Sequence, residues 1–316
     1  MASAGVVKAA KKSMGIARRE TIAMYLFLAP AIIGFFWFWL YPTITTLVMS
    51  FFNWDAAGNK TFIGIDNFIR MATTDKLFPI SVRVTVTFTL VSVTLNMILG
   101  FVIASMLNQS RKSVGVFRTI YYIPCMIAAG APAMITWKWI FSQEGMLNTM
   151  LKRAGVTGPN WLNDTQFALS AIIIMSVWGV GSIMIIFISG LKAIPDEFYE
   201  SAVIDGAGYF RKMFSITLPM LSPTILYNLI MGIIGALQSF TAAFVLTRGG
   251  PRYQTTFYAL NVYNQAFLNL SFGYASALAW VLFVAVMLLT LLIFKTSARW
   301  VFYGDGMDSE KRKGKR

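Results

Sequence analysis

The chain has 316 residues, of which 57% are hydrophobic and only 13% charged. A soluble domain carries about 25% charged residues, so the expected surroundings of this chain are lipid. One cysteine and no histidine are present, which excludes an internal disulfide framework and removes the commonest metal ligand, so we predict no metal site. The formal net charge of +14 lies mostly in tails and short loops, which favours contacts with anionic lipid over a nucleic-acid partner.

The first segment, residues 1–20, is polar and basic, and an uncharged stretch follows it from residue 21 to residue 54. This stretch is far longer than the apolar core of a signal peptide, which has about 7–15 residues, and no small-residue cleavage site closes it. We therefore predict a retained transmembrane helix over residues 23–47, which Pro30 and Pro42 can bend.

Five more uncharged runs follow the first helix, and each is close to or longer than the roughly 20 apolar residues that a membrane span needs. Together with the first helix they predict an all-α membrane protein with six transmembrane helices. The six-helix membrane domain covers residues 21–298, between basic tails over residues 1–20 and 299–316. The five runs are residues 84–110, 119–137, 165–191, 213–247 and 253–294.

The segments between the runs carry local signals of turns and short helices. Residues 53–55 and 58–59 are typical of turns, as is the glycine-rich string at 247–251. Residues 146–153 predict one short helix.

The distribution of Lys and Arg predicts the orientation of the chain. If the N-terminus is cytoplasmic, eighteen of the 27 basic residues fall on the cytoplasmic side and nine on the other. The positive-inside rule therefore favours cytoplasmic N- and C-termini. It also puts the loop over residues 194–219 in the cytoplasm.

The loop over residues 194–219 is predicted to form two short helices separated by a glycine break. Pro195 suits a first helical position, and Asp196 and Glu197 suit a first turn, where the helix dipole favours anions. Gly206 and Gly208 interrupt the pattern, and Pro219 is expected to close it.

This loop resembles the EAA signature of permease subunits of binding-protein-dependent ABC importers. Glu200, Ser201 and Ala202 match the opening triplet, with serine for the central alanine, and Gly206 follows after three residues. In that family the helix pair is the coupling helix, which sits in a groove of the cytoplasmic ATPase. The residues that the resemblance assigns to ATPase coupling are Glu200, Ser201, Ala202, Asp205, Gly206, Ile216, Leu218 and Pro219.

Further strings, in the same order, are similar to the sugar branch of these permeases, of the maltose and glycerol-phosphate type. They are LAP at 28–30, LYP at 40–42, SFFNWD at 50–55, FIGIDNF at 62–68, FRT at 117–119, LTRGGP at 246–251 and FGYASA at 272–277.

The resemblance implies a type I ABC-importer permease in the bacterial inner membrane, with no catalytic residues of its own. Its implied partners are a second homologous permease subunit, two ATPase subunits that bind ATP and magnesium, and an extracytoplasmic solute-binding protein. The implied substrate is a sugar or oligosaccharide, and no cofactor is expected in this chain.

The sequence itself argues for an external energy source. No G-x-x-x-x-G-K-[ST] phosphate loop is present. The six runs contain no ionisable groups of the kind that ion-driven carriers place at mid-membrane depth. Two alternatives remain: a self-sufficient secondary carrier or channel for small polar solutes, and a membrane scaffold in a larger complex.

A sugar path is expected to be lined by neutral polar and aromatic side chains, because sugars present both hydroxyls and C–H faces that stack on rings. Interhelical hydrogen bonding is the alternative role for the same residues, and for Asn96 it is the favoured one. The candidates for the substrate path are Trp178, Ser182, Tyr227, Asn228, Gln238 and Ser239.

Four basic residues, Arg83, Lys138, Arg248 and Arg252, fall near the outer ends of the predicted helices. They are expected either to reach the interface or an acidic binding protein, or to admit an anionic sugar.

Overall fold

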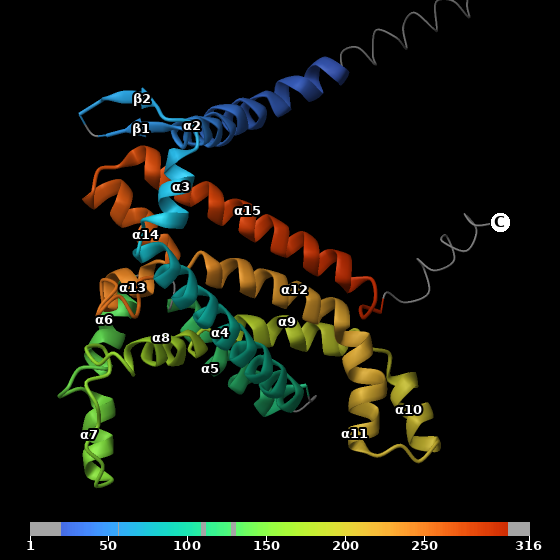
Figure 1. Cartoon of the computed structure of the whole chain (residues 1–316). Helices are drawn as coiled ribbons and strands as arrows, with labels where there is room; N and C mark the ends of the chain where they lie inside the picture. The colour runs from blue at the N-terminus through green and yellow to red at the C-terminus, as the bar shows by residue number, and fades with distance from the viewer. Residues whose placement is uncertain (1–19, 56, 109–111, 128–130, 303–316) are drawn as a thin grey trace, which may run out of the picture.

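The computed structural model describes residues 20–55, 57–108, 112–127 and 131–302, and it is mostly helical (Figure 1). The predicted tails lie outside these residues, apart from Glu20 and residues 299–302.

Among the described residues, four helical segments are long and apolar enough to cross a membrane: Glu20–Met49, Leu77–Leu107 (α4), Tyr209–Leu246 and Phe272–Ser297 (α15). A fifth candidate is the pair α8 (Ala168–Val177) and α9 (Val180–Lys192), whose axes meet at 42°. The predicted third span falls on α5 (Lys112–Ile127) and α6 (Ala131–Ile140), on either side of residues 128–130, which lie outside the described part. Six spans therefore stay a prediction.

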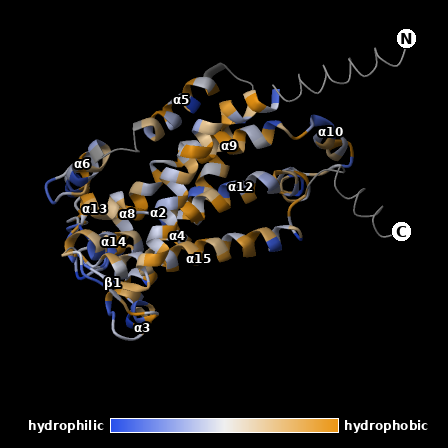
Figure 2. Ribbon diagram, turned by 90° about the horizontal axis from the view of Figure 1, so that it is seen from above, coloured by the Kyte–Doolittle hydropathy of each residue, from blue (hydrophilic) through white to orange (hydrophobic). Residues whose placement is uncertain are grey.

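The centre of the bundle is formed by α4, α9 and α12 (Leu218–Leu237), with α15 alongside α12 (Figure 1). Small residues let these helices approach. A Cβ atom at Gly100 would lie 2.7 Å from the Ile183 side chain, and one at Gly190 would lie 2.5 Å from the Thr224 hydroxyl. Figure 2 shows hydrophobic residues along the helices and hydrophilic ones concentrated at their ends. This is the distribution expected of a chain in lipid.

At the end opposite α10 (Asp196–Ile204) and α11 (Tyr209–Lys212), the chain forms a small cap (Figure 1). Strands β1 (Phe52–Trp54) and β2 (Lys60–Phe62) pair antiparallel, with Asn53 opposite Thr61. The prediction of a turn at residues 53–55 was wrong for its first two residues, because the buried amide of Asn67 donates to the carbonyls of Ser50 and Phe52 at 2.8 and 3.1 Å and holds this strand extended.

Short helices complete the cap and connect it to the bundle. They are α3 (Asp66–Thr73), α7 (Met146–Arg153), α13 (Thr241–Leu246) and α14 (Tyr258–Tyr263), which continues into the π-helical turn η3 (Asn264–Leu268). The bounds of α7 confirm the predicted short helix. The turn at 247–251 is also confirmed, since the Thr255 and Thr256 hydroxyls donate to the carbonyls of Gly250 and Gly249.

Two prolines follow π-helical turns. The turn η1 (Phe35–Leu40) precedes α2 (Tyr41–Met49), whose second residue is Pro42, and η2 (Met213–Thr217) precedes α12, whose second residue is Pro219. A proline has no N–H and its ring crowds the carbonyl four residues earlier, and the wider π turn relieves that crowding. The expectation that Pro219 ends the helix pair was therefore wrong: the chain stays helical through it.

A carboxylate joins α4 and α15 at the cap. Asp75 accepts the backbone N–H groups of Leu77 and Phe78 at 2.7 and 3.3 Å, so it caps α4, and it also accepts the hydroxyl of Tyr274 on α15. The Arg70 guanidinium of α3 lies 4.5 Å from the Tyr274 ring centroid.

We expect Asp75→Ala to destabilise the fold by about 2 kcal/mol, because it removes a helix cap and a charge-assisted hydrogen bond together. The measurement is the thermal unfolding midpoint in detergent, which should fall by several degrees. Asp66→Ala, at an exposed position in the first turn of α3, is the control. An equal midpoint for the two variants would contradict the assignment.

Candidate functional site

The helix pair, residues 194–219, has the predicted glycine break. It consists of α10 (Asp196–Ile204) and α11 (Tyr209–Lys212). Pro195 is the residue before the first helical position rather than in it. At the end of α10 the N–H groups of Gly206 and Ala207 bond to the carbonyls of Val203 and Ala202, at 3.0 and 2.8 Å, and Gly206 has φ +72°. This is the Schellman arrangement, in which the left-handed residue is favoured to be glycine.

One side of the helix pair packs against the bundle. Ile194 is buried, and Tyr199 packs with Ile216 against the cluster around Leu191. The Tyr199 hydroxyl lies 3.0 Å from that of Thr217, which is itself buried in η2. The α10 helix is therefore linked to η2 by a side-chain hydrogen bond, and both elements pack on the same apolar cluster.

The other side of the helix pair exposes large apolar side chains. Ile204 is 87% exposed and Phe210 is 74% exposed. Such a surface costs free energy in water, so it is suited to insertion into a groove of another chain. Further exposed apolar residues of the pair are Phe198, Val203, Tyr209 and Phe214.

The residues that the resemblance assigns to coupling divide between these two sides. Glu200, Ser201, Asp205 and Gly206 are exposed on the helix pair, with Ala202 half-buried. Ile216, Leu218 and Pro219 are half-buried where the chain enters α12.

We call residues 209–237, which run through α11, η2 and α12 without a break, the connecting helix. Figure 1 shows it changing direction between α11 and α12, where η2 lies. Nineteen residues separate Tyr209 from Asn228, so at 1.5 Å per residue the connecting helix carries the chain roughly 28 Å from the helix pair into the bundle.

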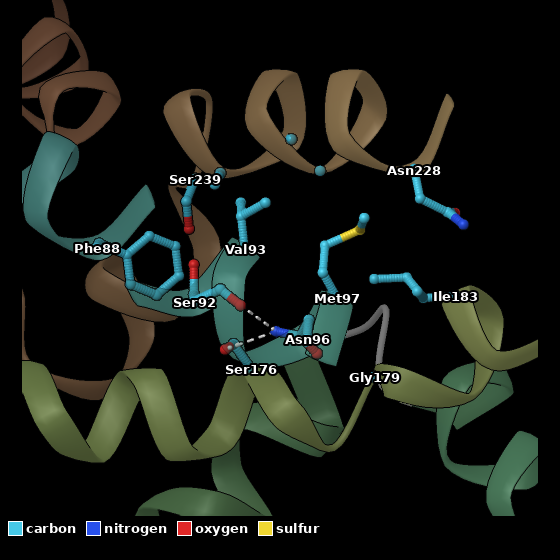
Figure 3. A pocket seen from close by; sticks show the side chains of 13 residues that line it. Phe88, Ser92, Val93, Asn96, Met97, Ser176, Gly179, Ile183, Asn228 and Ser239 are labelled. Atoms are coloured by element: carbon cyan, nitrogen blue, oxygen red, sulfur yellow. Dashed lines mark hydrogen bonds between the residues drawn. The ribbon is translucent and has the colours of Figure 1, made fainter. Parts of the chain in front are cut away.

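A cavity of about 260 Å³ lies where the connecting helix crosses α4 and the α8–α9 bend (Figure 3). Its walls are Phe88, Ser92, Val93, Asn96 and Met97 of α4, Ser176, Gly179 and Ile183 around the bend, and Asn228, Gly232, Gly235, Ala236 and Ser239. The lining contains neutral polar groups among apolar ones and no ionisable side chain.

The two asparagines of this cavity differ in their hydrogen bonds. The Asn96 amide nitrogen donates to the Ser92 carbonyl at 2.8 Å and to the Ser176 hydroxyl at 3.4 Å. Asn228 is only 3% exposed, and its amide nitrogen has no hydrogen-bond partner among the described residues. An unpaired buried amide is costly, which sets Asn228 apart from Asn96 in this cavity.

The predicted substrate-path residues are only partly brought together. Asn228 and Ser239 line the cavity. Trp178 instead lines an apolar groove beside Trp137, with ring centroids 5.3 Å apart, and Gln238 lines a groove against α15. Ser182 and Tyr227 are exposed.

Ser92 and Ser176 line the cavity and were not predicted. The four-residue spacing of Ser92 and Asn96 was a usable signal, because it places both on one helix face. Helices also approach closely at Gly181, where a Cβ would overlap the Tyr121 carbonyl, and at Gly232, whereas a Cβ at Gly235 would meet no described atom within 4 Å.

The described residues contain no group of three or more His, Cys, Asp or Glu side chains that could hold a metal ion.

Comparison with known proteins gives one family. A family model described as "binding-protein-dependent transport system inner membrane component" matches residues 96–301. A probable ABC transporter permease protein, YesP of Bacillus subtilis, is 40% identical over 93% of this chain and 96% of its own. The trehalose/maltose transport system permease protein MalF of Thermococcus litoralis is 36% identical over 87% and 89%.

The fold is shared with a solved structure. A chain of a bacterial ABC transporter involved in the import of the acidic polysaccharide alginate superposes with a TM-score of 0.78, covering 89% of this chain and 96% of that one at 22% identity. The type I ABC permease fold of the described helices follows from this likeness.

The asparagine pair gives a matched test of what the cavity amides do. Asn228→Leu is expected to leave the thermal unfolding midpoint in detergent unchanged or raised, because it replaces an amide without a partner by an apolar group. Asn96→Leu is expected to lower the midpoint, since it leaves the Ser176 hydroxyl without that contact, at a cost of about 1–2 kcal/mol. A fall in both variants would mean that Asn228 has a structural role.

Proposed function

We infer that this chain, which belongs to the family of binding-protein-dependent transport system inner membrane components, is a permease subunit of an ATP-driven importer of sugars or oligosaccharides. The relatives named as sugar permeases support the substrate class. The chain crosses the bacterial inner membrane several times, and we propose six spans with both termini in the cytoplasm.

The main support for this proposal is that the connecting helix joins the helix pair to the cavity. It begins in a helix pair with exposed apolar side chains and ends at a cavity that contains an amide without a partner. ATP-driven closure of an ATPase dimer would move α10 and α11. The hydroxyl contact between Tyr199 and Thr217 would transfer this motion to η2, and α12 would change the shape of the cavity.

The partners follow from the same arrangement. Two ATPase subunits supply the grooves for the helix pair and for its counterpart on a second, homologous permease, and they alone bind ATP and magnesium. The Glu20–Met49 helix has no buried residue within its most apolar window, which leaves it free to contact lipid and the second permease. A solute-binding protein would dock on the opposite side, over the cap. This chain has no catalytic role.

The cavity suits a small neutral polar solute. Its volume of about 260 Å³ is near the lower end of the range for ligand pockets, about 300–1,000 Å³, so we propose that it holds one sugar unit of a longer substrate at a time. Asn228 would donate to a sugar hydroxyl, and the Phe88 ring offers an apolar face. The lining has no ionisable group, which argues against a proton- or sodium-driven carrier.

Gly206→Pro tests the coupling role. Proline fixes φ near −65° and has no N–H, so it can adopt neither the φ of +72° nor the hydrogen bond to Val203. We expect the variant to insert into membranes normally but to lose copurification of the ATPase. Gly208→Pro is the matched control, because Gly208 has φ −69°. Normal copurification with Gly206→Pro would count against the proposal.

Reconstitution tests transport itself. Proteoliposomes that contain both permeases, the ATPase subunits and the binding protein should accumulate a labelled oligosaccharide only with ATP. Asn228→Leu should reduce uptake about tenfold while the assembly stays intact, since a hydrogen bond to a buried polar group is worth about 1.5 kcal/mol.

Uptake by this chain alone would instead show a self-sufficient carrier or channel, and intact transport by a Glu200→Ala, Gly206→Pro double variant would show that the helix pair has another role.

A parallel assay with neutral and uronate oligosaccharides tests whether the transporter accepts anionic sugars. Uptake of the uronate would assign that role to the exposed basic residues Arg83, Lys138, Arg248 and Arg252.

A further inference from the structure

The start of α12, from Pro219 to Pro223, lacks backbone hydrogen bonds of a regular helix, and we call this segment the joint. Pro219 and Pro223 lie four residues apart, so Pro223 cannot donate the N–H that would normally bond to the Pro219 carbonyl. Pro219 itself donates no N–H to the turn before it. The joint directly follows η2, where the helix changes direction. A helix that lacks successive backbone hydrogen bonds bends more easily than the helix on either side.

Ser222 replaces the missing donor. Its hydroxyl donates to the Pro219 carbonyl, which lies three residues earlier. Ser222 is 3% exposed, so its hydroxyl bonds within the protein. A Ser hydroxyl that bonds back to its own helix is common, but here the carbonyl it reaches has lost its backbone partner to a proline.

The same hydroxyl also accepts a hydrogen bond from a segment near the C-terminus of the described chain. After α15, the backbone N–H of Phe302 donates to the Ser222 oxygen at 2.8 Å. The neighbouring Val301 is 9% exposed and packs with Leu226 and Ile230 of α12. Residues 301–302 therefore lie against the joint, on a segment that enters from α15, and Ser222 connects the two.

We propose that Ser222 is a positioning residue for coupling: it braces the Pro219–Pro223 joint against the segment after α15, so that motion of the helix pair moves α12 instead of bending the joint. The proposal rests on the coupling role given above. Tyr199 and Thr217 brace the joint from the side of the helix pair, and Ser222 with Phe302 braces it from the side of α15.

The test compares three variants in the complete reconstituted transporter. Ser222→Ala removes the hydroxyl and leaves the Pro219 carbonyl and the Phe302 N–H without these bonds. Ser222→Ala with Pro223→Ala restores a backbone donor for the Pro219 carbonyl. Ser215→Ala, at an exposed position on η2, is the matched control. The readouts are ATPase copurification, ATP hydrolysis and labelled oligosaccharide uptake.

We expect Ser222→Ala to bind the ATPase normally but to transport about fivefold less solute per ATP hydrolysed, which corresponds to the loss of one net hydrogen bond. The double variant should recover only part of this ratio, because it restores the backbone bond to Pro219 but not the contact to Phe302, and Ser215→Ala should match the wild type. A wild-type ratio in Ser222→Ala, or full recovery in the double variant, overturns the proposal.

Hydrogen exchange on the purified chain separates the two proposals. Exchange at the Phe302 amide should accelerate in Ser222→Ala and in the double variant, and stay slow in Ser215→Ala. If the wild-type chain shows this protection but binds no ATPase, the proposed function fails while the Ser222 contact stands. If the Phe302 amide is unprotected in the wild type, the brace fails whatever the transport assay gives.

Discussion

A helix in lipid must satisfy its backbone hydrogen bonds within the protein, and the treatment of prolines in this chain follows from that requirement. Pro42 and Pro219 come directly after π-helical turns, which absorb the crowding of the proline ring. At Pro219 the π turn is not sufficient, because Pro223 removes a second donor, and the Ser222 hydroxyl takes its place. The segment between Pro219 and Pro223 is thus held by the Ser222 hydroxyl and, through it, by the backbone N–H of Phe302.

The same requirement distinguishes the two asparagines of the cavity. Asn96 is bonded to Ser92 and Ser176 and ties α4 to α8, whereas the Asn228 amide nitrogen, one helix away across the cavity, has no partner among the described residues (Figure 3). Nothing compensates the desolvation of Asn228 within the described chain, which is a stability cost that a bound solute can offset. Its position on α12 also makes it sensitive to any movement of the helix pair.

The proposed coupling requires a continuous physical path with few compliant points. In the structure, α10 contacts η2 through Tyr199 and Thr217, η2 continues into α12, and α12 forms one wall of the cavity. Close helix contacts at Gly190 and Gly232 leave little room for α12 to slide independently of α9 and α4. Tight packing of this kind favours movement between discrete arrangements over gradual deformation.

The sequence by itself determined the class of the protein and the helix pair. Uncharged runs of about 20 residues leave a membrane helix as the main possibility, and the EAA-like spacing around Gly206 located the pair to within a residue at Asp196. It did not determine which polar residues meet: Asn228 and Ser239 share a cavity, while Trp178 and Gln238 face other grooves. In a helix that is apolar on all sides, periodicity does not reveal which face turns inward, because lipid and protein interior are equally apolar. Only tertiary packing decided that, and only the fold brought Phe302 to Ser222, since a contact across 80 residues leaves no local signal.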